Sequence, residues 1–344
     1  TMAGQEADVE AKLRAYREAI AKGVEFILSH ANPDGSVGPV DVRLFYYRLP
    51  WALARAGKLA EGARLVDWML KNQFTKDGSL EGLSPRAVFD TRYGSYPASN
   101  FLMGAALFQR HDIVQKGVED LLKRWVDPKT GGSPNVAGDA GSEQEIMTTS
   151  QCGMTLLATG RVAEARKCGD FLVKLWELQP TPETCLYNAF NPVKDALVTE
   201  GFPADAEVTY VVRKDKPWEM HYNGGIAAAC LAELYLATGE QVYLTAARGY
   251  QEFSMTTAEC QFQSKQICKS GWGSGLLWTA TREPKYLDWT LRIGDWFVGE
   301  QLADGHWENT KKYAPNPTLA DNLEITTEFV LHLCNIVCYA GLTP

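Results

Sequence analysis

A helical hairpin that recurs along this chain constrains its fold more than any other feature. In the clearest copy, from Glu219 to Phe253, small and apolar residues fill the first half, Thr238-Gly239-Glu240 follows, and the second half carries one apolar stripe. A helix that is apolar on most faces is buried on most faces, whereas a single stripe marks a helix at the surface. Glycine supplies the left-handed residue that ends many helices. The segment therefore predicts a buried inner helix, a tight turn and an amphipathic outer helix.

Four further copies of this hairpin span residues 46–72, 95–122, 148–175 and 270–298. With the helices expected at 9–30 and 322–340, about twelve helices alternate between outer and inner positions, at a repeat of about fifty residues that is typical of ring-forming or stacked units. The inner-to-outer turns are short and the outer-to-inner loops are long. We therefore predict an all-α (α/α)6 barrel, or toroid, as a single domain over residues 1–344. Its long loops should gather at one end, where every inner helix begins.

Two segments depart from the simple pattern. Pro50 lies inside the inner helix expected at 42–56, and a proline within a helix usually kinks it. The connection 179–218 is the longest, and connections of this length are usually functional. Its segment EVTYVVR (207–213) is rich in β-prone residues, so we expect a small β-hairpin in this loop.

Charge and cysteine usage narrow the partners. The formal net charge is −8 and no block of Lys and Arg occurs, which argues against nucleic acid or an anionic membrane as a partner. No apolar run reaches the roughly 20 residues of a membrane span, and the polar N-terminal segment lacks a signal-peptide core. The eight cysteines form no C-x-x-C pair and the five histidines are scattered. We expect a cytoplasmic protein with reduced thiols, a small-molecule substrate, and no metal or cofactor; a homo-oligomer is compatible with the sequence.

Three loops carry a family resemblance. The segments NPDGSVG (32–38), TKDGSLEG (75–82) and ADGHWEN (303–309) resemble the Q-x-x-D-G-x-W turn of terpenoid cyclases and protein prenyltransferases, which are α/α toroids of this alternating design. At the level of architecture the resemblance covers nearly the whole chain. Six-hairpin glycosidase-type barrels and sugar 2-epimerases share the layout, so the fold does not settle the chemistry.

The chain also departs from that family. The D-x-D-D acid motif of squalene–hopene-type cyclases and the D-D-x-x-D motif of class I terpene synthases are absent, and the zinc ligands of prenyltransferases have no match. The resemblance thus implies a smaller toroid enzyme with proton-driven lyase, isomerase or cyclase chemistry, as in linalool dehydratase–isomerase-like toroids.

Candidate site residues lie where the inner helices begin, because helix N-termini present unpaired N–H groups and partial positive charge. An Asp in an apolar cavity has a raised pKa and suits a general acid, and a His suits a base or proton relay. The candidate catalytic residues are Asp41, Asp90, Cys152, His221 and Glu324. The candidate substrate-binding residues are Arg43, Tyr46, Tyr47, Tyr93, Tyr96, Gln151, Tyr222, Trp272, Trp307 and Glu328.

Structural roles compete with several of these assignments. Asp41 also fits a helix cap, Asp90 a salt bridge with Arg92, and Cys152 a core thiol. Glu324 and Glu328 are four residues apart and share a helix face, either in salt bridges or as an acid/base pair.

Three functions remain open from the sequence. Aromatic rings stabilise cationic intermediates, which favours a metal-independent acid/base lyase, isomerase or cyclase that acts on a mainly apolar, terpenoid- or polyketide-like molecule. Aromatic rings also stack on sugars, so a glycoside hydrolase or sugar epimerase is the alternative. The third possibility is a non-catalytic toroid that binds a partner, as many helical repeat proteins do.

Overall fold

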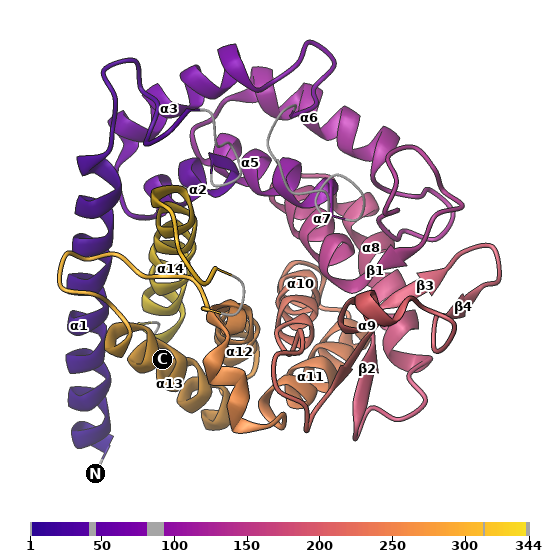
Figure 1. Ribbon diagram of the computed structural model, residues 1–344. Helices are drawn as coiled ribbons and strands as arrows, with labels where there is room; N and C mark the ends of the chain where they lie inside the picture. Colours follow the sequence, from indigo (N-terminus) through magenta and orange to yellow (C-terminus); the bar gives the residue numbers. More distant parts are fainter. Residues whose placement is uncertain (1, 41–45, 81–92, 312–313, 342–344) are drawn as a thin grey trace.

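Helices in two concentric layers form a ring (Figure 1) in this computed structural model, which describes residues 2–40, 46–80, 93–311 and 314–341. The inner helices are α2 (Leu49–Arg55), α5 (Ser95–Leu107), α7 (Ile146–Ala158), α10 (Asn223–Thr238), α12 (Cys268–Thr281) and α14 (Leu319–Ala340). The outer helices are α1 (Met2–Ser29), α3 (Leu59–Asn72), α6 (His111–Arg124), α8 (Val162–Glu177), α11 (Gln241–Met255) and α13 (Pro284–Gly299). The prediction of an all-α (α/α)6 toroid is confirmed.

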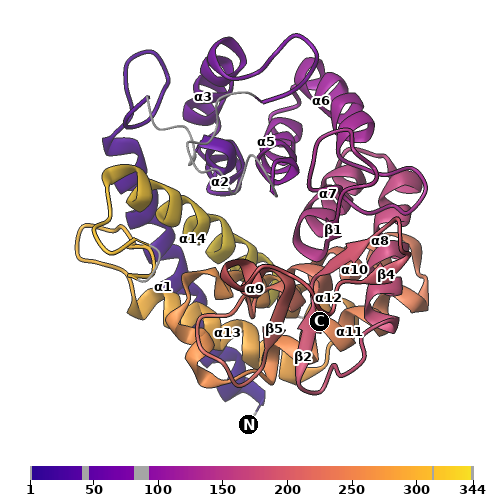
Figure 2. The same ribbon diagram turned by 45° about the vertical axis from the view of Figure 1, so that its right-hand side comes forward.

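The two ends of the chain close the ring. The N-terminal helix α1 packs along the C-terminal helix α14 and also contacts α13, as two views show (Figures 1 and 2). This pair takes the place of a sixth hairpin, although its two helices are at opposite ends of the sequence. Gly23 permits the close approach, because a Cβ atom there would lie 2.7 Å from Val330 and 2.9 Å from Trp307.

The inner helices are buried nearly all round, as their composition predicts. In α10, every residue from Asn223 to Ala232 is buried. Neighbouring inner helices approach so closely that a Cβ atom at Gly225 would lie 2.4 Å from the Cα atom of Ser270 on α12. Gly239 ends α10 with φ of 74°, the left-handed cap expected from the sequence.

The long connections contain short strands and 3-10 helices. The strands are β1 (Gln144–Glu145), β2 (Cys185–Tyr187), β3 (Ala189–Asn191), β4 (Ala196–Leu197) and β5 (Val211–Arg213). β3 and β4 form the small hairpin expected in the 179–218 connection, β1 pairs with β3, and β2 pairs with β5, all antiparallel. The EVTYVVR segment is only half strand, because Glu207–Tyr210 forms the short helix α9 before β5 begins. The 3-10 helices are η1 (Tyr46–Arg48), η2 (Ala204–Ala206), η3 (Glu259–Gln263) and η4 (Lys265–Ile267).

The kink expected at Pro50 is absent from the described part of this segment. Residues Tyr46–Arg48 form η1, and α2 begins at Leu49, so Pro50 occupies the first turn of the helix. The missing N–H of proline has no helical partner to lose at that position. Pro50 therefore starts α2 instead of bending it, and this prediction was wrong.

Helix α14 is long and apolar enough to cross a membrane by length and composition alone, which the sequence reading did not anticipate. However, 78% of its 18-residue window is buried inside the protein. That burial is typical of a core helix and matches its place in the inner layer (Figure 2).

Candidate active site

Three buried charged side chains from three inner segments meet at the centre of the candidate site. Arg48, at the end of η1, places Nη1 3.2 Å from Oε2 of Glu328 on α14. Lys269, in the first turn of α12, donates from Nζ to Oε1 of the same carboxylate at 2.7 Å. The side chains of Arg48, Lys269 and Glu328 are only 7%, 3% and 2% exposed. We call these three residues the inner ion cluster.

A second carboxylate balances the charge. Glu324 lies one turn before Glu328 on α14, and its Oε1 is 3.9 Å from Nη1 of Arg48. Two cations thus face two carboxylates. Buried charges are tolerated only when they are paired in this way, because each loses the solvation of water.

The electrostatics keep every member of the inner ion cluster charged. Burial alone would raise the pKa of Glu328, but Arg48 and Lys269 hold it well below its usual range. Burial alone would lower the pKa of Lys269, but the Glu328 carboxylate raises it above its usual value. Glu328 is therefore a fixed anion and not a proton donor.

A neutral imidazole adjoins the cluster. His332 follows Glu328 by one turn of α14, with Nε2 4.0 Å from Oε1 of Glu328. Burial lowers the pKa of His332 to about 3, an effect that Glu328 partly opposes and the cations Lys269 and Arg48 reinforce. The ring is thus uncharged at neutral pH. Across the described residues, its Nδ1 has no hydrogen-bond partner.

Aromatic rings surround these groups. The Arg48 guanidinium lies 4.6 Å from the ring centroid of Tyr47 and 5.6 Å from that of Tyr96. The Lys269 ammonium lies 5.0 Å from the ring of Tyr222. The Trp272 ring packs edge-on against His332 at 5.5 Å and against Trp51 at 5.6 Å. The rings orient the cations by cation–π attraction and exclude water around them.

Several buried polar side chains have no hydrogen-bond partner in the described part of the chain. Six of them are the amides of Gln151, Asn223 and Asn335, and the hydroxyls of Tyr47, Thr148 and Thr327. Asn335 lies seven residues after Glu328 and three after His332, which places it on the same face of α14. Buried polar groups are normally paired, so these six side chains have hydrogen-bonding capacity that the described residues do not use.

The same region contains the potential ligand atoms of Cys268, Glu328 and His332 within 4.8 Å of one another. A divalent cation would meet unfavourable neighbours there. The Lys269 ammonium already binds Oε1 of Glu328, and burial raises the pKa of Cys268, which keeps its thiol protonated. Metal ligation needs deprotonated ligands, so these residues fit an ion-pair site better than a metal site.

The structure brings six of the predicted site residues into this region, namely Tyr47, Tyr96, Tyr222, Trp272, Glu324 and Glu328. Gln151 is buried and unpartnered within the described residues. The hydroxyl of Tyr93 donates to the Met220 sulfur at 4.0 Å, which ties the start of α5 to the start of α10. Asp41, Arg43 and Asp90 lie outside the described residues.

Two predicted binding residues have structural roles instead. The Tyr46 hydroxyl donates to the carbonyl of Val37 at 2.6 Å, and its ring stacks on Trp68 of the outer helix α3. Trp307 is fully buried, donates from Nε1 to the carbonyl of Phe297, and packs on Phe329. The Tyr46 ring therefore packs on the outer helix α3, and the Trp307 ring packs on Phe329 of the inner helix α14.

Two predicted catalytic residues, Cys152 and His221, make structural contacts. Cys152 packs between α7 and α5, where its sulfur lies 3.5 Å from the Ser99 hydroxyl, and burial raises the pKa of its thiol. The His221 Nε2 lies 3.1 Å from the carbonyl oxygen of Arg213, which holds the end of β5 against the start of α10. Burial lowers the pKa of His221. We assign Cys152 to the core and His221 to loop positioning.

Sequence reasoning missed Arg48, Lys269 and His332. A signal existed for each of them. His332 follows Glu324 and Glu328 at a spacing of four, so all three share one face of α14. Lys269 is the one charged residue of α12, and Arg48 directly precedes the buried residues 49–53 of α2; a buried charge of this kind needs a partner.

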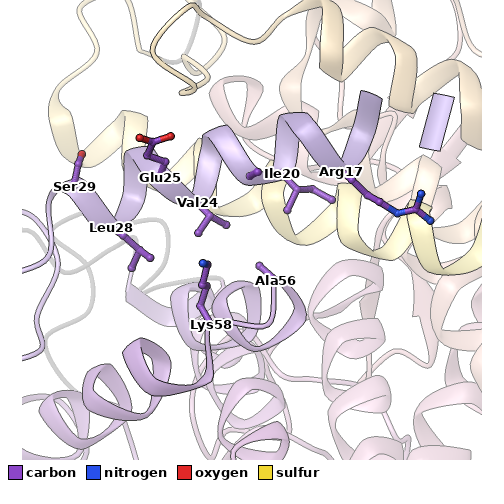
Figure 3. Close-up of a pocket in the computed structure, with 9 residues that line it drawn as sticks. Arg17, Ile20, Val24, Glu25, Leu28, Ser29, Ala56 and Lys58 are labelled. Carbon is purple, nitrogen blue, oxygen red and sulfur yellow. The ribbon is translucent and has the colours of Figure 1, made fainter. Parts of the chain in front are cut away.

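A separate hollow of about 670 Å³ lies on the outside of the ring, between α1 and the turn that joins α2 to α3 (Figure 3). Its walls are mainly apolar, from Ile20, Val24 and Leu28 of α1, and Lys58 points toward them. It contains no residue of the inner ion cluster, so we exclude it from the candidate site.

Comparisons with known proteins support the fold and leave the chemistry open. No protein-family model matches the sequence, and no curated protein matches it. Among solved structures, a D-mannose isomerase is similar at a TM-score of 0.66 and 12% identity, covering 94% of this chain and 97% of that chain. An α-1,6-mannanase of glycoside hydrolase family 76 from Salegentibacter has a TM-score of 0.65 and 12% identity, covering 94% and 99%.

A type II terpene cyclase from Scytonema, solved with geranylgeranyl dihydroxybenzoate, has a TM-score of 0.61 and 12% identity, covering 97% of this chain and 99% of that chain. The resemblance to terpenoid cyclases is thus supported at the level of the toroid. It is not specific, because the sugar enzymes match equally well.

Proposed function

We propose that this protein is an acid/base isomerase or epimerase of a sugar in its open-chain form. The main support is the neutral imidazole of His332, which lies beside the inner ion cluster. In that cluster Glu328 holds two buried cations in place. A base next to fixed positive charge suits removal of a proton from a carbon adjacent to a carbonyl group, because that step forms an oxyanion. The similarity to a D-mannose isomerase supports the same class at the level of fold.

The reaction balances without an added oxidant or reductant. The imidazole of His332 takes the proton from C2, the C2–H electron pair forms the C1–C2 double bond, and the carbonyl oxygen becomes an enediolate oxygen. Lys269 and Arg48 stabilise that charge. Transfer of the O2 proton to O1 and return of the carbon-bound proton from His332 to C1 gives the ketose. Rotation of the enediolate about the C2–C3 bond turns the opposite face of C2 toward His332, and return of the proton to C2 there, with re-formation of the C1 carbonyl, gives the epimer. The oxyanion raises the proton affinity of the nearby imidazole as it forms.

The same geometry disfavours glycoside hydrolysis. That reaction requires one protonated carboxylic acid with a raised pKa and one carboxylate. Glu328 is held ionised by two cations, and Arg48 contacts both Glu324 and Glu328. The two acids therefore resemble a salt-bridged pair more than an acid and its base.

The second candidate is chemistry on a mainly apolar molecule through a cationic intermediate. The rings of Tyr47, Tyr96, Tyr222, Trp51 and Trp272 favour it. Four buried charged side chains argue against it, because an apolar substrate would desolvate them without offering new hydrogen bonds. Its proposed acids, Asp41 and Asp90, lie outside the described residues.

Deuterium exchange tests the proposal. The purified protein is incubated with a panel of aldoses and ketoses in D₂O, the C2 proton signal is followed by NMR, and products are separated by chromatography. We expect exchange and an isomeric product for at least one sugar. His332→Gln should lower the rate at least about 100-fold, since general-base catalysis contributes about 10²–10⁴.

The matched control is His111→Gln, which removes an exposed histidine at the start of α6 and should leave the rate unchanged. Exchange at the wild-type rate in a folded His332→Gln variant would remove His332 as the base. A protein inert toward all sugars that forms a dehydrated or cyclised product from a prenyl substrate would favour the second candidate.

A further inference from the structure

A second hollow, of about 340 Å³, lies among the connections that lead from outer to inner helices, on the face where the inner helices begin. Its walls come from Trp296 of α13 and from three outer-to-inner connections, which contribute Trp218, residues 262, 263 and 265, and residues 300, 302 and 308–311. The volume is at the lower end of the roughly 300–1,000 Å³ of small-molecule pockets, so it fits one ring-sized ligand. We infer that this hollow, which we call the rim pocket, binds a neutral pyranose ring.

Three aromatic rings and a balanced set of charges line the rim pocket. Phe262 and Trp296 hold each other edge-to-face with centroids 5.9 Å apart, and Trp218 lies on the wall as well. Lys265 and Lys311 supply two positive charges, and Glu300 and Glu308 supply two negative ones. A cationic ligand would thus be repelled by the two lysines, and an anionic ligand by the two glutamates. A neutral ligand with an apolar face for the rings and hydroxyl groups for the polar side chains fits best.

The polar wall is fixed by its own contacts. The Lys265 ammonium pairs with Glu300 and lies 5.0 Å from the Trp296 ring. The backbone N–H of Lys265 donates to the Thr310 hydroxyl at 3.1 Å. Asn309 is 6% exposed and its Oδ1 accepts from the N–H of Thr310 at 2.7 Å. Such contacts hold the side chains in position before a ligand arrives, which lowers the entropy cost of binding.

Trp218, on the wall of the rim pocket, has a strained backbone conformation. Its φ is 65°, in the left-handed region that bulky side chains rarely adopt. Residues held in that region concentrate at ligand clamps and active sites. Trp218 lines the rim pocket in this conformation, and its ring is available to stack on a sugar.

The inference does not depend on the proposed function. Methyl glycosides of hexoses are suitable probes, because their rings cannot open and the proposed isomerase step cannot consume them. Binding is measured by saturation-transfer NMR and titration calorimetry with methyl glucopyranoside, methyl mannopyranoside and methyl galactopyranoside. We expect at least one to bind, with a dissociation constant on the order of 1 mM.

Variants locate the site. Trp218→Gly removes the ring at a φ that glycine tolerates, so the protein should stay folded while affinity falls at least tenfold. Glu308→Gln, which alters one hydrogen-bonding group of the wall, should weaken binding severalfold. Trp278→Leu removes a half-buried tryptophan from α12, outside the rim pocket, and should leave binding unchanged. His332→Gln should leave it unchanged as well.

Three results would overturn the rim pocket as a sugar site. Unchanged affinity in folded Trp218→Gly and Glu308→Gln, or no binding of any methyl glycoside to the wild type, would overturn the rim pocket. Loss of binding in His332→Gln with retention in Trp218→Gly would also overturn it and place the ligand at the inner ion cluster. Rim binding without any isomerase activity would leave this inference standing and count only against the proposed function.

Discussion

The ammonium of Lys269 donates to Oε1 of Glu328 at 2.7 Å, and both side chains are almost completely buried. The two residues belong to neighbouring inner helices, α12 and α14, and Arg48 approaches the other carboxylate oxygen. One carboxylate thus joins three segments that are far apart in sequence. Because these groups are withdrawn from water, their charge balance links the stability of the ring to the chemistry of the site.

Stability should follow that charge balance. Lys269→Met leaves two carboxylates facing Arg48 alone, and Glu328→Gln leaves two cations facing Glu324. Each single change should lower the free energy of unfolding by about 3 kcal/mol, because it strands a buried charge. The double variant restores one cation against one carboxylate and should lose less than either single variant. Urea denaturation followed by circular dichroism measures all three, and strictly additive losses would show that the charges do not interact.

Acid should destabilise the protein in part through His332. Its pKa is about 3 in the folded state against a usual value of about 6.5, so the unfolded chain binds more protons between these values. This contribution to stability is present above pH about 6.5 and is lost as the pH falls toward 3, with a slope of at most about 1.4 kcal/mol per pH unit. His332→Gln should flatten the pH dependence of unfolding between pH 5 and 6.5 relative to wild type. His111→Gln should not, and an unchanged slope in His332→Gln would contradict the buried neutral imidazole.

The pH–rate profile should lack the usual acidic limb of a histidine base. For the free enzyme, kcat/KM falls only when the essential base becomes protonated. With the pKa of His332 near 3, kcat/KM for sugar exchange should stay level from pH 8 to about 5 in protein shown to be folded. A midpoint near pH 6.5 would identify a base with an ordinary pKa and would count against His332 in this role.

Ring closure should depend on Gly23. A Cβ atom there would lie 2.7 Å from Val330 of α14 and 2.9 Å from Trp307. Gly23→Ala should therefore lower the free energy of unfolding by about 1–3 kcal/mol, as overpacked cores do, although alanine is the better helix former. Gly299→Ala, at the end of α13, is the matched control because no atom lies within 4 Å of its added Cβ. Equal melting temperatures for the two variants would show that α1 does not need this close approach.

Much of the fold was predictable because the two helix classes differ in composition. The all-round apolar sequence of Asn223–Thr238 and the stripe of Gln241–Met255 each predict their own layer, and Gly239 predicts the turn between them. The predicted kink at Pro50 was wrong because the local sequence does not show where the helix begins relative to the proline. Only part of the β-prone segment 207–213 forms a strand, because β-structure depends on whether a partner strand is available. Val211–Arg213 pairs with β2, and the residues before it do not.

The arrangement of the candidate site was predictable only in part. The shared helix face of Glu324 and Glu328 was predictable because residues four apart lie on one face, and the same rule extends to His332. Tyr46 and Trp307 were misplaced, since proximity to a helix start does not tell whether a ring faces the centre or an outer helix.

By itself, the sequence determined the alternation of buried and amphipathic helices. It also determined that the long outer-to-inner loops lie at the end of the ring where the inner helices begin. Both features are encoded by short-range patterns of hydrophobicity and turns. Only the tertiary structure decided that Arg48 and Lys269 share the carboxylate of Glu328 beside a neutral His332. Those residues are separated by up to 284 positions, and their contact and their proton affinities arise from ring closure and from the loss of water around buried charges, which no local pattern records.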